Sequence, residues 1–95
     1  MKTGLILAAL AMAIPSANAG TVTLPALVAA CTGCHPASGG DPALPKLAGR
    51  DAGSIVAAMD AFRSGDRPAT VMDRIARGIS HDEASVIAAW YAAKQ

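Results

Sequence analysis

The sequence is short of aromatic residues, of charge and of cysteine, and each shortage excludes a class of protein. Only 3% of its 95 residues are aromatic, so one Trp, one Tyr and one Phe serve the whole chain. Eight basic and seven acidic residues give a net charge of +1, which excludes a nucleic-acid-binding protein with a broad basic face. Two cysteines are too few for a fold built on several disulfides, and 53% hydrophobic residues are too many for a disordered chain. One small domain with a modest core remains.

No hydrophobic run is long enough to span a membrane. The longest, over residues 5–14, is about half the length of the roughly 20 apolar residues that a spanning helix needs. Lys2 precedes it, Pro15 follows it, and residues 17–19 (Ala-Asn-Ala) form the small-x-small pattern of a signal-peptidase site. This order predicts a cleaved Sec-type signal peptide over residues 1–19, a mature domain over 20–95 without a membrane span, and export to the periplasm.

Helical patterns separated by Pro- and Gly-rich loops run through the mature chain, and no alternating strand pattern is present. Asp51 is the expected N-cap of one helix, and Ser80 with Glu83 predicts a capping box for the last. These two helices carry apolar stripes, formed by Ile55, Val56, Met59 and Phe62 and by Val86, Ile87, Trp90 and Tyr91. We expect helices over 25–30, 51–65, 70–77 and from 80 onward, with loops over 36–49 and 66–69. The predicted fold class is all-α.

Residues 31–35 (Cys-Thr-Gly-Cys-His) have the spacing C-x-x-C-H, which is the attachment sequence of a c-type haem. Residues three apart share one helix face, so Cys31 and Cys34 can form thioethers to both vinyl groups of one porphyrin. His35 then lies under the ring, where an imidazole nitrogen can bind iron. Its other ring nitrogen needs an acceptor, for which the backbone carbonyls of residues 42–45 are available. One covalent haem c would also supply apolar bulk to a core that has few aromatic residues.

Three other uses of these cysteines remain open. A thiol–disulfide oxidoreductase places its C-x-x-C pair at a strand-to-helix turn, and no strand pattern precedes Cys31. A zinc site takes four ligands, and residues 20–95 offer only Cys31, Cys34, His35 and His81 as sulfur or imidazole ligands. A structural disulfide across two intervening residues would close too short a loop to stabilise much. Covalent haem is the use that export and the adjacent histidine both favour.

The second axial ligand of such a haem is a Met, a His or an exchangeable site. Residues 20–95 offer Met59, Met72 and His81. Met59 lies on an apolar stripe and His81 in a polar first turn, whereas Met72 follows a loop far enough from His35 to reach the opposite haem face. We therefore expect His35 and Met72 to ligate the iron, which predicts an electron carrier rather than an enzyme. A haem-based gas sensor, in which a small molecule displaces Met72, is the alternative.

Taken together, these residues resemble a class I cytochrome c. The resemblance rests on C-T-G-C-H, on residues 45–49 (PKLAG), on a methionine before I-A-x-G, and on a final helix ending I-A-A-W-Y-A. More narrowly, residues 61–65 (AFRSG) and 67–72 (RPATVM) are similar to the cytochrome subunits of flavocytochrome c sulfide dehydrogenases. Pro36 departs from the family, in which many members have Gly at that position.

The resemblance implies about four short helices around one covalently attached haem. It implies thioethers at Cys31 and Cys34, axial ligands at His35 and Met72, and a Pro45 carbonyl that accepts the His35 N–H. It also implies redox-protein partners as electron donor and acceptor, and in the narrower case a flavoprotein partner.

Five arginines are spread around the predicted haem site, namely Arg50, Arg63, Arg67, Arg74 and Arg77. Each is expected to be an ordinary solvated surface charge. The alternative is that some of them steer a negatively charged redox partner, and Arg67 and Arg74 are the candidates for this because they bracket Met72.

Overall fold

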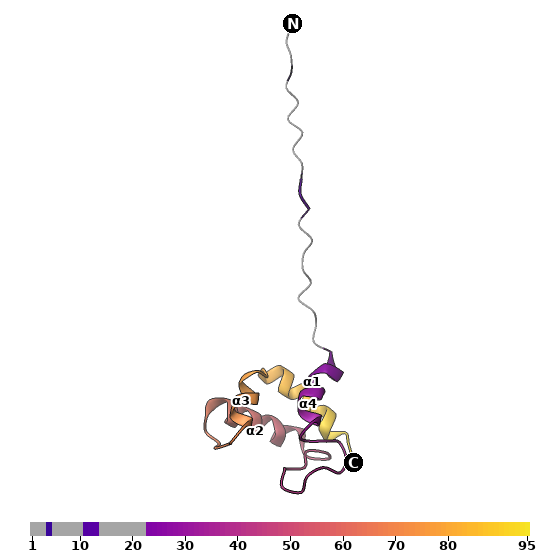
Figure 1. Cartoon of the computed structure of the whole chain (residues 1–95), viewed down its shortest axis with the longest axis vertical. Helices are drawn as coiled ribbons and strands as arrows, with labels where there is room; N and C mark the ends of the chain where they lie inside the picture. The colour runs from indigo at the N-terminus through magenta and orange to yellow at the C-terminus, as the bar shows by residue number, and fades with distance from the viewer. Residues whose placement is uncertain (1–3, 5–10, 14–22) are drawn as a thin grey trace.

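The computed structural model describes Gly4, residues 11–13 and residues 23–95. Within these residues the chain forms four helices and no strand, so the predicted all-α class is confirmed (Figure 1). The helices are α1 (Leu24–Thr32), α2 (Ala52–Ser64), α3 (Met72–Arg77) and α4 (His81–Ala92). The predicted signal peptide, residues 1–19, lies outside the described residues except for Gly4 and 11–13. None of the helices in the described part of the chain is long and apolar enough to cross a membrane.

Local capping signals fix both ends of α2 and the start of α4 where the sequence predicts them. The Asp51 carboxylate accepts the Ser54 N–H at 2.9 Å and so caps the start of α2. Gly65 ends α2 in the left-handed conformation, with φ of 84°, which a residue with a side chain adopts only at a cost. At the start of α4, the Ser80 hydroxyl accepts the Glu83 N–H at 3.1 Å, and the Glu83 carboxylate accepts the Ser80 N–H at 3.0 Å. The predicted capping box is therefore present.

Three details differ from the sequence predictions. Helix α1 ends at Thr32, two residues beyond the predicted end at residue 30. Helix α3 begins at Met72 rather than at Thr70, and no side chain caps it, since the N-cap residue is Val71, whose side chain has no hydrogen-bonding group. Val86, predicted on the buried stripe of α4, is 46% exposed. Successive helical residues are about 100° apart, so Val86 turns away when Ile87 faces inward. The buried residues of α4 are Ala84, Ile87, Ala88 and Tyr91.

The core lies where α4 packs against α1 and α2. In Figure 1, α1 and α4 cross on one side, and α2 and α3 lie on the other. The buried cluster consists of Leu27, Val28, Ile55, Ile87, Ala88 and Tyr91. Tyr91 is the only large side chain of the described residues that is fully buried. The core is therefore small, and α4 is its central element.

Candidate cofactor site

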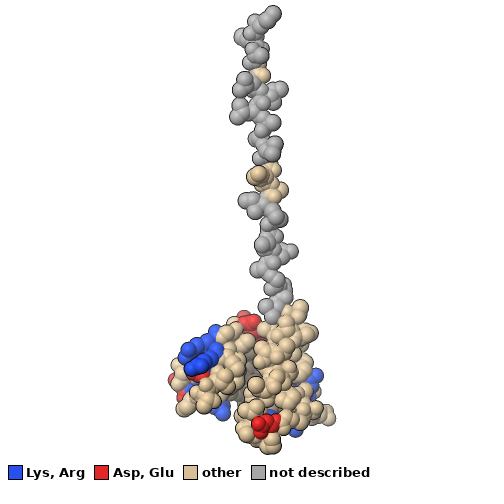
Figure 2. Space-filling model, viewed as in Figure 1, with Lys and Arg blue, Asp and Glu red and all other residues tan. Residues whose placement is uncertain are grey.

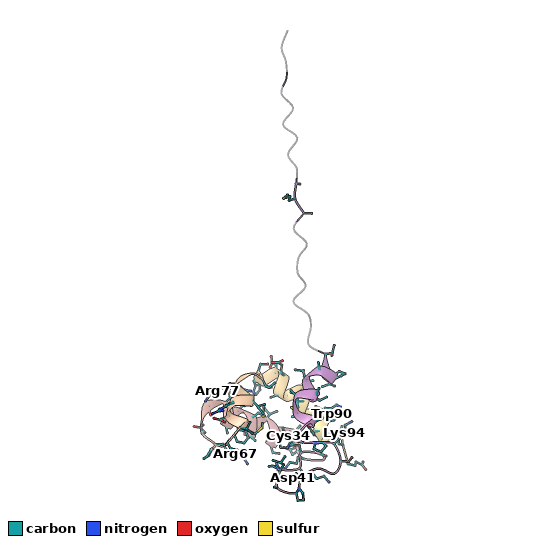
Figure 3. All side chains as sticks on the ribbon, viewed as in Figure 1. Cys34, Asp41, Arg67, Arg77, Trp90 and Lys94 are labelled. Atoms are coloured by element: carbon teal, nitrogen blue, oxygen red, sulfur yellow. The ribbon has the colours of Figure 1, made fainter. Side chains whose placement is uncertain are left out.

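A cavity of about 350 Å³ opens between the C-x-x-C-H segment, α2 and α3. Its wall is mostly apolar, and its volume is in the range of small-molecule and cofactor sites. The structure brings together around it all five residues that the sequence predicts for the haem site: Cys31, Cys34, His35, Pro45 and Met72. Figure 3 labels Cys34 near the middle of the molecule, between the helices and the long loop. These residues come from α1, from that loop and from α3.

His35 is held at both its side chain and its backbone. Its ring Nδ1 lies 2.8 Å from the carbonyl oxygen of Pro45, the acceptor that the resemblance implies. Because a carbonyl oxygen can only accept, Nδ1 is the donor in this bond, and Nε2 is the ring nitrogen available to a metal. The His35 carbonyl in turn accepts the hydroxyl of Tyr91 at 2.5 Å. Burial, and then the charge of the Cys31 thiolate, raise the pKa of Tyr91 to about 12, so this hydroxyl remains a donor at neutral pH.

The two cysteines lie on one continuous helical turn, although α1 ends between them. Cys31 is half-buried in the last turn of α1, and Cys34 is exposed two residues after the helix ends. Gly33 keeps right-handed helical angles, and the N–H groups of Cys34 and His35 both donate to the Cys31 carbonyl, at 3.1 and 2.8 Å. The helical geometry that the sequence predicts for the motif is therefore retained.

The thiol of Cys31 is poorly suited to nucleophilic chemistry. Burial raises its pKa above the ordinary value, whereas a reactive thiol needs a lowered pKa. Its sulfur lies 3.9 Å from the Leu27 carbonyl, one turn earlier in α1. The structure describes no strand before Cys31, within residues 23–95, that would form the strand-to-helix turn of a thiol oxidoreductase. The thiol–disulfide hypothesis therefore gains no support from the geometry.

Two methionines contribute to the cavity wall, and the sequence predicted only one. Met72, the first residue of α3, is half-buried there, and Met59 of α2 is half-buried on the same wall. The apolar stripe that contains Met59 predicts a core position for this residue, but Met59 is not part of the buried cluster. His81 is not on the wall; its side chain is 61% exposed and its Nδ1 lies 3.0 Å from the Asp60 carboxylate. Of the three candidates for the second ligand, Met59 and Met72 therefore line the cavity and His81 does not.

The arginines differ more among themselves than the sequence analysis predicts. Arg67 lines the cavity and places its guanidinium 4.9 Å from the centre of the Phe62 ring, which also lines it. Arg50 lies on the wall too, whereas Arg74 is exposed on α3 and does not. Lys and Arg side chains gather over the α3 side in Figure 2, where Figure 3 labels Arg67 and Arg77. Arg50 and Arg67 are therefore the charged residues of the cavity wall, and both are basic.

Arg63 is the residue whose role the sequence analysis missed. It was predicted to be a solvated charge, but its side chain is only 29% exposed and donates to two backbone carbonyls and to Asp60. The spacing of Asp60 and Arg63 in one helix is a signal for an ion pair. The two carbonyl acceptors lie 13 and 16 positions further along the chain, so no local pattern reveals them.

The residues present fit a covalently attached haem. An apolar cavity, two free thiols three residues apart, an imidazole of fixed tautomer and a nearby thioether are the groups that such a cofactor requires. The zinc hypothesis requires several His, Cys, Asp or Glu side chains that converge on one metal ion. Within the described residues, no group of three or more such side chains is arranged in this way. No protein-family model, curated protein or solved structure matches this chain.

Proposed function

We propose that this protein is an exported, periplasmic c-type cytochrome, which carries single electrons between redox proteins and is not itself an enzyme. One observation carries the proposal more than any other. The Nδ1–H of His35 donates a hydrogen bond to the Pro45 carbonyl at 2.8 Å. His35 lies on the wall of an apolar cavity that Cys31 and Cys34 also line. A histidine whose second nitrogen is fixed in this way is typical of a metal ligand.

Each site residue has a separate task in this proposal. Cys31 and Cys34 hold the cofactor through thioethers, so it cannot dissociate when the protein diffuses between partners. His35 is an axial ligand, and its bond to Pro45 fixes the ring orientation and raises the basicity of Nε2. Met72 is the second ligand; its soft thioether favours the reduced state and raises the reduction potential. When bound, haem supplies a one-electron iron couple.

The test is an optical spectrum of the protein made in a host with haem-maturation machinery. We expect sharp α and β bands in the reduced protein, and colour that survives acid–acetone extraction, because thioethers resist it. The Cys31→Ala, Cys34→Ala double variant is the matched control and should lose its colour on extraction. A colourless wild-type protein with two titratable thiols would overturn the proposal in favour of thiol or zinc chemistry.

A pair of matched substitutions decides between the two methionines. Met72→Ala and Met59→Ala remove the same side chain from the same cavity wall. We expect Met72→Ala to abolish the weak long-wavelength band of Met-ligated ferric haem and to let the reduced protein bind carbon monoxide, while Met59→Ala keeps the band. The reverse result would make Met59 the ligand. Ready binding of carbon monoxide by the wild type would instead support a gas sensor.

In its narrower form, the proposal makes this protein the electron-transfer subunit of a flavoprotein sulfide dehydrogenase. The resemblance over residues 61–72 supports it, and two basic side chains suit a partner of negative charge: Arg67 on the cavity wall and the exposed Arg74 on α3. A tagged chain at native expression level should then recover a flavoprotein in a pull-down. Recovery of none would remove this narrower form and leave the electron carrier standing.

A further inference from the structure

Arg63, in the last turn of α2, ties this helix through its guanidinium group to α3 and to the turn that follows α3. Its Nε donates to the carbonyl oxygens of Ala76, at 3.3 Å, and Ile79, at 3.0 Å. Its Nη2 donates to the Ile79 oxygen at 2.6 Å, and its Nη1 donates to the Asp60 carboxylate at 2.7 Å. Ala76 belongs to α3, and Ile79 lies in the turn that leads to α4. One side chain therefore fixes the end of α3 relative to α2.

Asp60 orients this guanidinium from one turn earlier in α2. Its carboxylate also lies 3.0 Å from Nδ1 of His81, the first residue of α4. The hydrogen bond from Arg63, followed by that from His81, lowers the pKa of Asp60, so the carboxylate is ionised at neutral pH. We refer to Arg63, Asp60 and His81 together as the Arg63 clamp. It joins α2 to both helices that follow it.

Helix α3 depends on such outside contacts for its position. It has only six residues, and an isolated helix of that length is not stable. Met72 is its first residue, and the fully buried Ala76 lies one turn later on the same face, about 6 Å along the axis. Because so short a helix moves as one piece, a displacement at Ala76 is passed on to Met72 at the cavity wall.

We propose that Arg63 is a positioning residue for Met72, and that the Arg63 clamp sets how far this thioether reaches into the cavity. The inference rests on the proposed function, in which Met72 is an axial ligand. Arg63 and Asp60 do not line the cavity, and the bond from Arg63 to the Ala76 carbonyl links them to Met72 through α3. Met72 is then the residue that binds the iron, and Arg63 is the residue that keeps Met72 within reach of it.

The experiment compares Arg63→Leu with Arg77→Leu in the haem-loaded mature protein. Arg77 also lies on the α3 side but is 68% exposed, so its loss removes the same charge without removing the clamp. The measured quantity is the affinity of the ferric protein for imidazole, which must displace Met72 to bind. Arg63→Leu removes all the guanidinium hydrogen bonds, and we expect the part of that loss that reaches Met72 to equal about one charge-assisted bond. Arg63→Leu should then bind imidazole about tenfold more tightly, and Arg77→Leu should stay within about twofold.

A second measurement separates positioning from general stabilisation. Guanidinium titrations follow the Met–iron absorption band and the far-ultraviolet circular dichroism of the helices in the same samples. In Arg63→Leu we expect the band to disappear at a lower denaturant concentration than the helices, whereas in the wild type and Arg77→Leu the two transitions coincide. A uniform shift of both transitions in Arg63→Leu would overturn the positioning role.

The outcomes also distinguish this inference from the proposed function. A wild type without the Met–iron band contradicts the Met72 ligand itself, and the inference falls with it. A wild-type band together with unchanged imidazole affinity in Arg63→Leu overturns the inference alone. If Arg63→Leu does not fold, Asp60→Asn replaces it, with the exposed Asp66→Asn as control. A rise in imidazole affinity is then expected for Asp60→Asn only, and its absence refutes the clamp.

Discussion

Removal of the Tyr91 hydroxyl tests how the last helix holds the C-x-x-C-H segment. Tyr91 is fully buried, and its hydroxyl donates to the His35 carbonyl, 56 positions away in the chain. Phenylalanine keeps the ring in the core but leaves this carbonyl without its donor. A buried polar group without its partner costs about 1–3 kcal/mol. We expect Tyr91→Phe to lower the free energy of unfolding by about 2 kcal/mol, or the Tm by roughly 10 °C in a domain of this size.

The control for this substitution is another hydroxyl on the same helix. The Ser85 hydroxyl donates at 3.0 Å to the carbonyl of His81, which lies one turn earlier in α4. Such a bond adds little to a helix, so Ser85→Ala should change the free energy of unfolding by less than about 0.5 kcal/mol. Guanidinium unfolding, followed by circular dichroism, measures both variants. If Tyr91→Phe is as stable as Ser85→Ala, the bond to His35 does not anchor the motif and the reasoning is refuted.

Three further predictions concern the helix cap, the clamp and the long loop. Ser80→Ala should cost about 1 kcal/mol of stability in the same unfolding assay, because it removes a capping box; no change would mean that the cap is redundant. Asp60 has a lowered pKa in the fold, so the stability it adds is present above its ordinary pKa of 3.8 and is lost as the pH falls through the lower folded value. The stability difference between wild type and Asp60→Asn should therefore be largest at neutral pH and shrink below about pH 4, and a difference independent of pH would contradict this. Pro45→Ala should loosen the acceptor of the His35 N–H and raise the reduction potential, whereas Pro42→Ala in the same loop should not; redox titration of both variants decides.

Features that depend on neighbours in the sequence could be predicted from the sequence. Asp51 and the Ser80–Glu83 pair cap helices through bonds to residues three positions away, so the residue types alone indicate them. The turn that carries Cys31, Cys34 and His35 is equally local, since its N–H groups bond to the carbonyl of Cys31. The start of α3 could not be placed from such signals, because no side chain caps it.

Features that depend on contacts between distant parts of the chain could not be predicted from the sequence. The carbonyl acceptors of Arg63 come into reach only when α3 has folded back against α2, so the arginine alone looks like any other surface charge. Met59 fits the apolar stripe of α2 equally well whether that stripe faces the core or a cavity. The bond between Tyr91 and His35 joins the last helix to the motif, and no pattern in either segment predicts it.

The core and the candidate site share side chains, which links the stability of the fold to the cofactor. Ile55 and Ile87 belong both to the buried cluster and to the wall of the cavity. Under the proposed function, a porphyrin packs against the same two residues that hold α2 to α4, and each Å² of apolar surface it covers adds about 25 cal/mol. A group that binds only the folded chain stabilises it by mass action. Under the same proposal, thioethers at Cys31 and Cys34 would make that stabilisation independent of cofactor concentration, and would offset the small core of a chain with three aromatic residues.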